Sequence, residues 1–268
     1  MKKIRIITAI LLIIGQVAFS QNKDKTYILI HGAWHGAWCW YKVVPEMTKK
    51  GFKAIAIDLP GHGKDTTNPE IVTFRMYVEK VKEVANSING QVILVGHSMS
   101  GTVISQAAEE LGKDKVNKLV YLDAFLPRNG ESVSKLAGMI FQTLPKETDT
   151  TKITFSKGIV NASNGKTRTF KPQVADVVFY HDCKKKDKEL AHQNLCRQAS
   201  EPLGATVALT DSIYGQIPKY YILCTEGKDL DKSLLPTRVK CEKVINIATS
   251  HSPFFSKPKE LARLFMML

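Results

Sequence analysis

The sequence predicts an α/β fold, a mainly parallel sheet flanked by helices, with an inserted cap. Three observations carry this prediction. Short apolar segments alternate with helical ones, several apolar segments end in Gly-containing loops, and the alternation stops between about residues 124 and 216 before it resumes. At 268 residues the chain is near the size at which a single core stops growing, so one domain with an insertion is expected.

The first elements alternate between strand and helix. The run TYILIHGAW predicts a short strand that ends in a Gly-containing loop, and FKAIAIDLPGHG repeats this pattern after a helix-forming stretch. A helical segment from Ile71 to Ile88 follows, then the strand QVILVG, the small-residue helix SGTVISQAAEEL and the strand VNKLVYLD. Near-continuous apolar strands of this kind are typical of a parallel sheet that is covered on both faces.

The alternation breaks after the strand VNKLVYLD. The stretch from about 124 to 216 contains Pro127, a polar segment at 161–169 and predicted helices around Lys188 and Leu203, which together indicate a cap. The core then resumes with the strand KYYILC, a short helix near 230–235, the strand KVINIA and a terminal helix over 258–268. We therefore predict one domain over residues 21–268 with the cap inside it.

Residues 1–20 have the features of a signal peptide. Basic residues at positions 2, 3 and 5 precede an apolar run from Ile6 to Ile14, and small residues at 18 and 20 suit a cleavage site. We expect cleavage before Gln21 and an exported protein, periplasmic or secreted. The alternative, an uncleaved anchor, would need about 20 apolar residues, so no stable membrane span is expected in the mature form.

The chain is basic. Its formal net charge is +13, and removal of the three positive charges of the leader lowers it to +10. The lysines are scattered apart from residues 184–186, and no aromatic-interleaved basic stripe accompanies them, so a nucleic-acid partner is not expected. A solvated surface that attracts anionic envelope components is the preferred interpretation.

Five cysteines leave at least one thiol unpaired, and their spacing fits no zinc site. In an exported chain, a disulfide between Cys183 and Cys196 and a pair of free thiols are both compatible with the sequence. No metal is expected.

The segment Gly96-His97-Ser98-Met99-Ser100-Gly101 lies between a predicted strand and a predicted helix. This context is typical of a strained turn that exposes a serine at the top of a sheet, and the small residues allow strand and helix to approach closely. Ser100 stands where the usual motif has a second glycine. We predict Ser98 as a nucleophile.

A nucleophilic serine needs a base and donors for an oxyanion. His251, in ATSHSPFF after the last predicted strand, fits the base. The backbone N–H groups of Met99, after the nucleophile, and Ala33, in the first loop, fit the donors. The remaining histidines are predicted to have structural roles: His31, His35, His62, His97, His181 and His192.

Five segments together resemble the α/β-hydrolase superfamily: HGAWHGAWCWYKVVP, IDLPGHG, VGHSMSGTV, LVYLDAFLP and SHSPFFSKP. The resemblance is to its small carboxylesterase branch, which includes bacterial pyrethroid-hydrolase-like esterases, plant methylesterases and hydroxynitrile lyases, and it covers nearly all of residues 26–268. It implies the α/β-hydrolase fold and a serine carboxylesterase-type enzyme. Such an enzyme hydrolyses carboxylic esters of small or medium apolar substrates through an acyl-enzyme and needs no cofactor.

The resemblance leaves the acid of the triad open. The family pattern after the strand KYYILC is T-x-D, whereas TEGKDL puts Gly227 at the aspartate. Asp123, at the end of VNKLVYLD, is the preferred acid, because some lipases of this fold carry their acid after that strand. Asp229 is the alternative if the loop is rebuilt, and a site with no working acid is the third interpretation.

We expect Trp34, Phe125 and Phe254 to line the substrate pocket, and Trp38 and Trp40 to belong to the core. Two other functions remain. Gly227 could mark a decayed triad in a ligand-binding protein. A lyase of the same superfamily is less favoured, because the related hydroxynitrile lyases use a lysine beside the histidine and a threonine in the first loop, where this chain has Ser252 and Gly32. Neither the natural ester nor the oligomeric state follows from the sequence.

Overall fold

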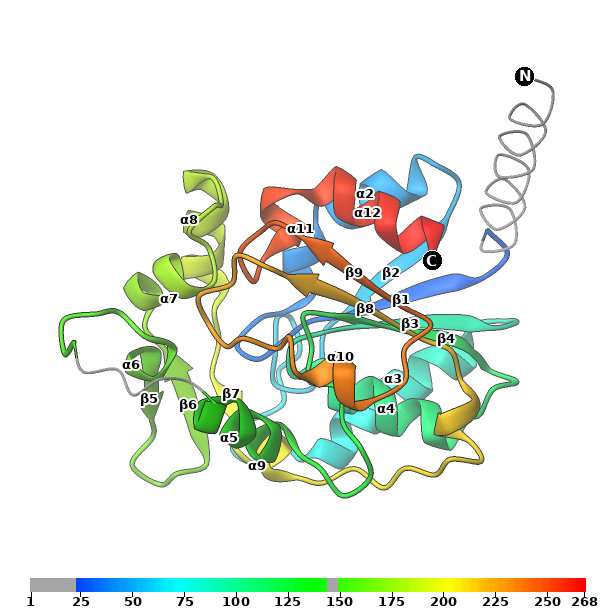
Figure 1. Ribbon diagram of the computed structural model, residues 1–268, viewed down its shortest axis with the longest axis horizontal. Coiled ribbons are helices and arrows are strands. Elements are labelled where there is room, and N and C mark those ends of the chain that lie inside the picture. Colours follow the sequence, from blue (N-terminus) through cyan, green and yellow to red (C-terminus); the bar gives the residue numbers. More distant parts are fainter. Residues whose placement is uncertain (1–22, 144–148) are drawn as a thin grey trace.

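A six-stranded parallel sheet forms the centre of the computed structural model, which describes residues 23–143 and 149–268 (Figure 1). The strand order is β2-β1-β3-β4-β8-β9. The predicted leader lies outside the described residues. The strands are β1 (Thr26–Ile30), β2 (Lys53–Ile57), β3 (Val92–His97), β4 (Val116–Leu122), β8 (Lys219–Cys224) and β9 (Lys243–Ile247).

Helices cover both faces of this sheet (Figure 1). On one face, α3 (Phe74–Ser87) packs against α4 (Ser100–Leu111); on the other, α2 (Val43–Thr48) packs against α12 (Pro258–Met267), next to α11 (Pro253–Ser256). Strands β1 and β3 are buried along their whole length, as expected of apolar strands between two helical layers. This arrangement confirms the predicted α/β class.

Local sequence signals explain where individual helices begin. The helix predicted from Ile71 begins at Phe74, because Thr73 is extended and its side chain accepts a hydrogen bond from the Met76 amide, which makes it the N-cap. The short helix predicted near 230–235 begins only at Leu235, where α10 (Leu235–Arg238) starts. The residues before α10 instead form a loop at the edge of the sheet.

The cap lies between β4 and β8. It contains a three-stranded antiparallel sheet, β5-β6-β7, that the sequence analysis did not anticipate. The polar segment 161–169 forms its hairpin, and Asn164-Gly165, with Gly165 at φ 69°, was the turn signal that could have revealed it. Its elements are α5 (Val133–Thr143), α6 (Phe155–Gly158), β5 (Ile159–Asn161), β6 (Thr167–Phe170), α7 (Pro172–Val178), α8 (Lys185–Asn194), β7 (Gln198–Ala199) and α9 (Glu201–Gly204).

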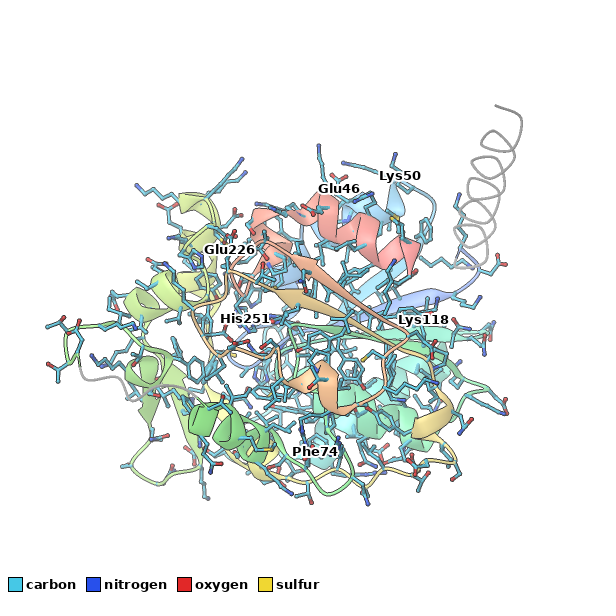
Figure 2. The ribbon with its side chains drawn as sticks, viewed as in Figure 1. Glu46, Lys50, Phe74, Lys118, Glu226 and His251 are labelled. Atoms are coloured by element: carbon cyan, nitrogen blue, oxygen red, sulfur yellow. The ribbon has the colours of Figure 1, made fainter. Side chains whose placement is uncertain are left out.

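Because the six strands are parallel, their carboxyl ends meet at one edge of the sheet. Figure 2 shows His251 and Glu226 at this edge and Lys118 at the opposite end. The loops after β1, β3, β4, β8 and β9 therefore converge on one place.

The structure bears on two expectations from the sequence, namely the disulfide between Cys183 and Cys196 and the membrane span. All five cysteines have free thiols, so Cys183 and Cys196 do not form a disulfide in this structure; Cys183 Sγ contacts Asp182, whereas Cys196 Sγ contacts the Trp34 carbonyl. Over residues 23–143 and 149–268, none of the helices combines the length and the apolar character that a membrane span requires.

Candidate active site

Ser98 occupies the sharp turn between β3 and α4. Its φ is 55°, a left-handed conformation that is uncommon for a residue with a side chain. The turn is held by hydrogen bonds from the Ser98 amide to the Leu122 carbonyl (3.2 Å) and from the Phe125 amide to the Ser98 carbonyl (3.0 Å). Ser98 is partly exposed and lines a cavity at the carboxyl edge of the sheet. The backbone is thus strained at the residue predicted to be the nucleophile.

Close packing around this turn explains its small residues. A Cβ atom at Gly32 would lie 2.8 Å from both His97 Nδ1 and Ser98 Cβ, and one at Gly101 would lie 2.1 Å from the Phe125 carbonyl oxygen. Ser100, which replaces the usual glycine, is fully buried and donates its hydroxyl hydrogen bond to the His31 carbonyl. The departure from the motif is tolerated because the extra hydroxyl has a partner.

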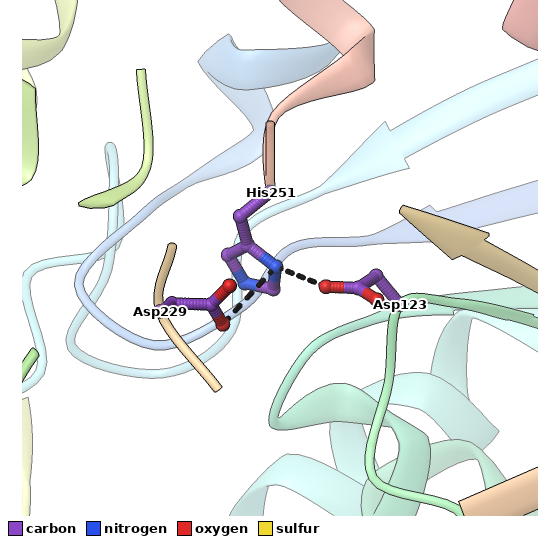
Figure 3. Close-up of side chains that lie close together, drawn as sticks. All are labelled: Asp123, Asp229 and His251. Atoms are coloured by element: carbon purple, nitrogen blue, oxygen red, sulfur yellow. Dashed lines mark hydrogen bonds and ion pairs between the residues drawn. The ribbon is translucent and has the colours of Figure 1, made fainter. Parts of the chain in front are cut away.

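Asp123 and His251 are joined by a short hydrogen bond. Asp123 follows β4 with φ 43°, a conformation that Asp tolerates better than most residues, and His251 lies in the loop after β9. The distance from Asp123 Oδ2 to His251 Nδ1 is 2.6 Å (Figure 3). This distance meets the geometric condition for a triad acid that orients the histidine.

Asp229 approaches the same nitrogen from the loop after β8. Its Oδ2 lies 3.4 Å from His251 Nδ1, farther than Asp123 (Figure 3). Asp229 Oδ1 lies 3.0 Å from the point where Gly227 would carry a Cβ atom, so the Asp229 side chain folds back toward the glycine. The other two acids of the loop, Glu226 and Asp231, are exposed. The two acids that the sequence analysis weighed therefore both reach His251, with Asp123 the nearer.

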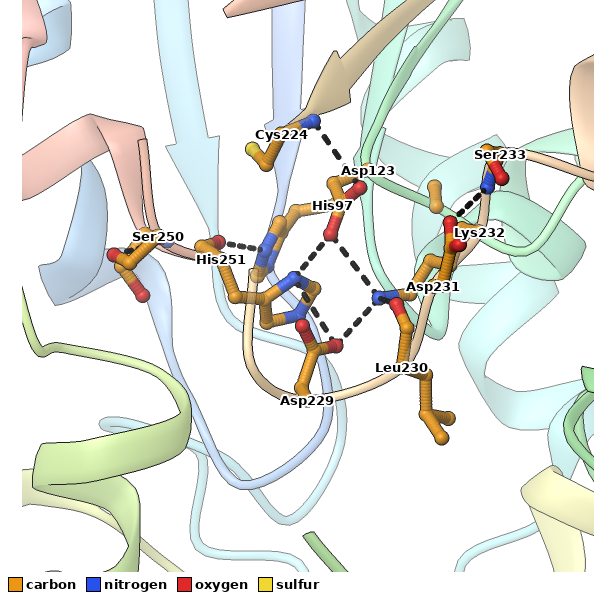
Figure 4. A network of polar contacts seen from close by, with 12 residues as sticks. His97, Asp123, Cys224, Asp229, Leu230, Asp231, Lys232, Ser233, Ser250 and His251 are labelled. Carbon is orange, nitrogen blue, oxygen red and sulfur yellow. Dashed lines mark hydrogen bonds and ion pairs between the residues drawn. The ribbon is translucent and has the colours of Figure 1, made fainter. Parts of the chain in front are cut away.

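A buried lysine that the sequence analysis missed links the two carboxylates. Lys232 is 1% exposed, and its Nζ donates to Asp123 Oδ2 (3.1 Å), Asp229 Oδ2 (2.5 Å) and the Leu230 carbonyl (3.2 Å), as Figure 4 shows. An ammonium has three N–H donors, so all of its donors are occupied. The spacing of Lys232 three residues after Asp229 was visible in the sequence, but its burial was not.

The charges of this network stabilise one another. Burial alone would raise the pKa of Asp123, but Lys232 and the hydrogen bond from His251 outweigh it and hold that pKa below its ordinary value. Burial opposes the charge of Lys232 too, yet the carboxylates of Asp123 and Asp229 raise its pKa above the ordinary value. Both directions favour an ionised Asp123 and a charged Lys232 at neutral pH.

The carboxylates of Asp123 and Asp229 and the ring of His251 place ligand-type atoms within 4.8 Å of one another. A metal ion bound there would have to displace the Lys232 ammonium from both carboxylates. The cluster therefore already contains the positive charge that its two carboxylates require.

The loop after β1 carries the predicted oxyanion donor Ala33. Ala33 and Met99 both line the cavity, and among the described residues no hydrogen bond from either backbone amide is found. His35 Nδ1 lies 2.8 Å from the Ala33 carbonyl, and His35 Nε2 lies 2.6 Å from the Tyr180 hydroxyl. Since a carbonyl can only accept, Nδ1 donates and Nε2 accepts from Tyr180. His35 thus ties the loop to the cap while both amides remain available.

The histidines nearest the site have structural partners. His31 Nδ1 donates to the Gly32 carbonyl (2.8 Å) and its Nε2 accepts from the Leu59 amide (3.1 Å), whereas His97 Nε2 donates to the His251 carbonyl (3.0 Å). Burial lowers the pKa of His31 and His97 well below the ordinary value and lowers that of His35 to about 4. These rings are neutral at pH 7 and position the loops around His251.

The cavity has a volume of about 270 Å³. Trp34 and Phe125 line it, as expected, but Phe254 does not. Phe254 lies in α11 and is fully buried in the core, with its ring centroid 5.1 Å from that of His97 and 5.3 Å from that of Trp40. The expectation for Phe254 is therefore corrected. The cap supplies lining residues that were not anticipated: Phe141, Phe155, Ile159, Arg168, Phe179 and Leu203.

Among the described residues, no hydrogen bond joins Ser98 Oγ to His251, although both residues line the cavity. Hydrogen bonds between catalytic groups are often long before substrate binds, so we expect the hydrogen bond between Ser98 and His251 to form in the substrate complex.

Comparison with known proteins gives consistent matches. The model of the alpha/beta hydrolase family matches residues 27–264. Methylesterase 7 of Arabidopsis thaliana is 30% identical over 259 residues, which cover 92% of this chain and 96% of that protein. Two crystal structures are each 26% identical to this chain. That of polyneuridine aldehyde esterase has a TM-score of 0.79 and covers 90% of this chain and 98% of its own. That of a pyrethroid hydrolase from Sphingobium faniae has a TM-score of 0.77 and covers 90% of this chain and 95% of its own.

Proposed function

Because the chain belongs to the alpha/beta hydrolase family, with esterases among its relatives, we propose that it is a serine esterase. Its substrates are carboxylic esters with a small or medium apolar body, in keeping with a cavity lined mainly by aromatic and aliphatic side chains. One observation carries the proposal: Ser98 and His251 line the same cavity, and Asp123 Oδ2 lies 2.6 Å from Nδ1 of His251.

The acylation step follows from this arrangement. Asp123 accepts the hydrogen bond from Nδ1 of His251, which leaves the lone pair on Nε2. Nε2 takes the proton of Ser98 Oγ as that oxygen attacks the ester carbonyl, and the amides of Met99 and Ala33 donate to the resulting oxyanion. The tetrahedral adduct collapses, the C–O bond of the ester breaks, and His251 returns the proton to the departing alcohol.

The deacylation step repeats the sequence with water. His251 removes a proton from a water molecule that attacks the acyl carbonyl, the same two amides hold the second oxyanion, and the bond to Ser98 breaks. The acid leaves and Ser98 recovers its proton. None of these steps draws on a cofactor.

The two alternatives are less well supported. A decayed triad would leave His251 without an acid, whereas Asp123 contacts it. The related hydroxynitrile lyases use a lysine beside the catalytic histidine, where this chain has Ser252. All three donors of Lys232 already have acceptors, which disfavours that role.

The proposal includes export. The basic and apolar leader and the small residues at 18 and 20 support cleavage before Gln21 and a periplasmic or secreted location for the mature enzyme.

Turnover of a short p-nitrophenyl ester, together with labelling by a fluorophosphonate serine probe, tests the proposed function. Ser98→Ala should remove labelling and lower kcat by at least about 10⁴-fold, because no other group in the mechanism can form the acyl-enzyme. Circular dichroism should show that the variant is folded. Comparable turnover by the folded variant would exclude a serine hydrolase.

A further inference from the structure

Arg168 is a charged residue of the cavity wall whose side chain has no polar partner in the described part of the chain. It lies on β6 of the cap and lines the cavity that contains Ser98. The other charged side chains of this wall, Asp229 and Lys232, bind each other. Within residues 23–143 and 149–268, the Arg168 side chain has no hydrogen bond, no carboxylate lies within 4.0 Å of it, and its buried Nε has no acceptor.

Arg168 is partly exposed, and its buried Nε is the donor that lacks an acceptor among the described residues. Burial lowers the pKa of the Arg168 guanidinium below its ordinary value, and no neighbouring acid opposes the effect. A guanidinium offers five N–H donors, and each donor that is withdrawn from water without an acceptor reduces stability. A wholly apolar substrate would cover these donors further. A substrate with an anionic oxygen would satisfy them.

The position of Arg168 relative to the reacting groups is anchored. Trp34 Nε1 donates to the Arg168 carbonyl (3.2 Å), and the ring of Trp34 packs against that of Phe170 on the same strand with centroids 4.9 Å apart. Trp34 directly follows Ala33, the predicted oxyanion donor. The strand that carries Arg168 is therefore held on the loop that would bind the ester carbonyl, so one molecule in the cavity can reach both.

We propose that Arg168 selects esters that carry a second, ionised carboxyl group, so that the preferred substrates are monoesters of dicarboxylic acids with an apolar chain between the two ends. The proposal rests on the proposed esterase function and makes it more specific. The apolar chain lies against the aromatic wall, and the carboxylate accepts from the guanidinium in the paired geometry that arginine favours. The positive net charge of the chain also attracts such a substrate.

The test compares two nearly isosteric esters, monomethyl suberate and the methyl ester of suberic acid monoamide, of which only the first is charged. The measured quantity is the ratio of their kcat/KM values from methanol release. The wild type should prefer the acid by about tenfold or more, mainly through KM, because a charged hydrogen-bonded pair is formed only with that substrate.

Variants of Arg168 distinguish the effect of its charge on the kcat/KM ratio from the effect of its packing. Arg168→Met keeps the aliphatic stem and should lower the ratio at least about tenfold, and Arg168→Lys should give an intermediate ratio. The matched control is Lys171→Gln, which changes the net charge at an exposed cap residue outside the cavity wall and should leave the ratio unchanged.

The outcomes distinguish this proposal from the proposed function. If p-nitrophenyl esters are hydrolysed but the wild type shows no preference for the acid, or if Arg168→Met affects both suberate esters equally, Arg168 is a packing residue and the inference is wrong. If no ester of either kind is hydrolysed and Ser98 is not labelled, the proposed function itself fails.

Discussion

At the scale of single residues, the site is organised by two carboxylates that share one histidine nitrogen and one lysine. Two carboxylates this close would repel, and one of them would tend to take up a proton. Lys232 binds Asp123 and Asp229 together, so Asp123 can stay ionised against His251 with Asp229 beside it. Lys232 is in this sense a positioning residue, because it acts through the carboxylates.

Asp123 lies nearer to His251 Nδ1 than Asp229 does, so we expect substitutions of the two acids to have different effects on kcat. Asp123→Asn should lower kcat by orders of magnitude, since the shorter contact orients His251 and stabilises its protonated form. Asp229→Asn should lower kcat less than about tenfold. Steady-state kinetics with a p-nitrophenyl ester checks both variants, and the opposite ranking would make Asp229 the triad acid.

Lys232→Met removes the charge but keeps the stem. It leaves two buried carboxylates without their cation and should reduce the free energy of unfolding by about 3–5 kcal/mol. Urea unfolding measures this effect.

The double variant Lys232→Met/Asp229→Asn is the control, because it removes one carboxylate together with the cation. It should recover part of the stability. Strictly additive effects of the two substitutions would show that Lys232 does not act through Asp229.

At the scale of elements, the sharp turn at Ser98 depends on the close approach of α4 to the segment after β4. That segment carries Asp123 at one end and Phe125 within it, so Ser98 and Asp123 are held by one packing contact. The cap hairpin is joined to the loop after β1 in a similar way, through Trp34. Displacement of either contact should therefore affect catalysis as well as stability.

Gly101→Ala tests the first contact. The added Cβ would lie 2.1 Å from the Phe125 carbonyl oxygen, so the segment must move, at a cost of about 1–3 kcal/mol in unfolding free energy and with a clear loss of kcat. The matched control is Gly204→Ala in α9, where no atom lies within 4 Å of the new Cβ; its unfolding free energy should change by less than about 1 kcal/mol. Equal effects of the two substitutions would argue against the packing explanation.

At the scale of the whole molecule, several histidines are buried in neutral form. Burial lowers the pKa of His35 to about 4 and also lowers those of His31, His62 and His97, whereas an unfolded chain titrates its histidines near the ordinary value of 6.5. Between these pH values the unfolded state binds more protons than the folded state. Folding stability should therefore decrease as the pH falls through this window.

Urea unfolding at pH values from 8 to 4 checks this expectation. The unfolding free energy should be highest above about pH 6.5 and should fall below it, with about 3 kcal/mol from His35 alone by pH 4. Asp123, whose pKa is lowered from the ordinary 3.8, contributes stability above that value and loses it at still lower pH, so the two effects are separable. A flat profile between pH 6.5 and 4 would contradict the assignment of neutral buried rings.

The proposed export is a property of the whole molecule. Intact-mass analysis of the protein from periplasm or medium should give a chain that begins at Gln21. The substitution Ala18→Arg should block the cleavage, because that position requires a small residue. Cytoplasmic protein that retains Met1 would contradict the proposed location.

The sequence by itself determined the features that depend on local patterns. Apolar runs and their spacing predicted the parallel strands, and the strand–GHSMSG–helix context identified the turn that exposes Ser98. The order of motifs also singled out His251 and narrowed the acid to Asp123 or Asp229. The strands and the turn at Ser98 agree with the structure because each rests on backbone geometry set within a few neighbouring residues, whereas the catalytic roles of Ser98, His251 and the acid stay predictions.

Only the tertiary structure decided which side chains meet. Asp123 and His251 are 128 positions apart and come together because β4, β8 and β9 are adjacent and end at the same edge. Burial of Lys232 between two carboxylates, burial of Phe254 in the core and the position of Arg168 in the cavity wall likewise depend on packing between distant segments. Residue patterns do not encode such contacts directly, because the energy of a buried charge or ring depends on all the groups that surround it in the folded chain.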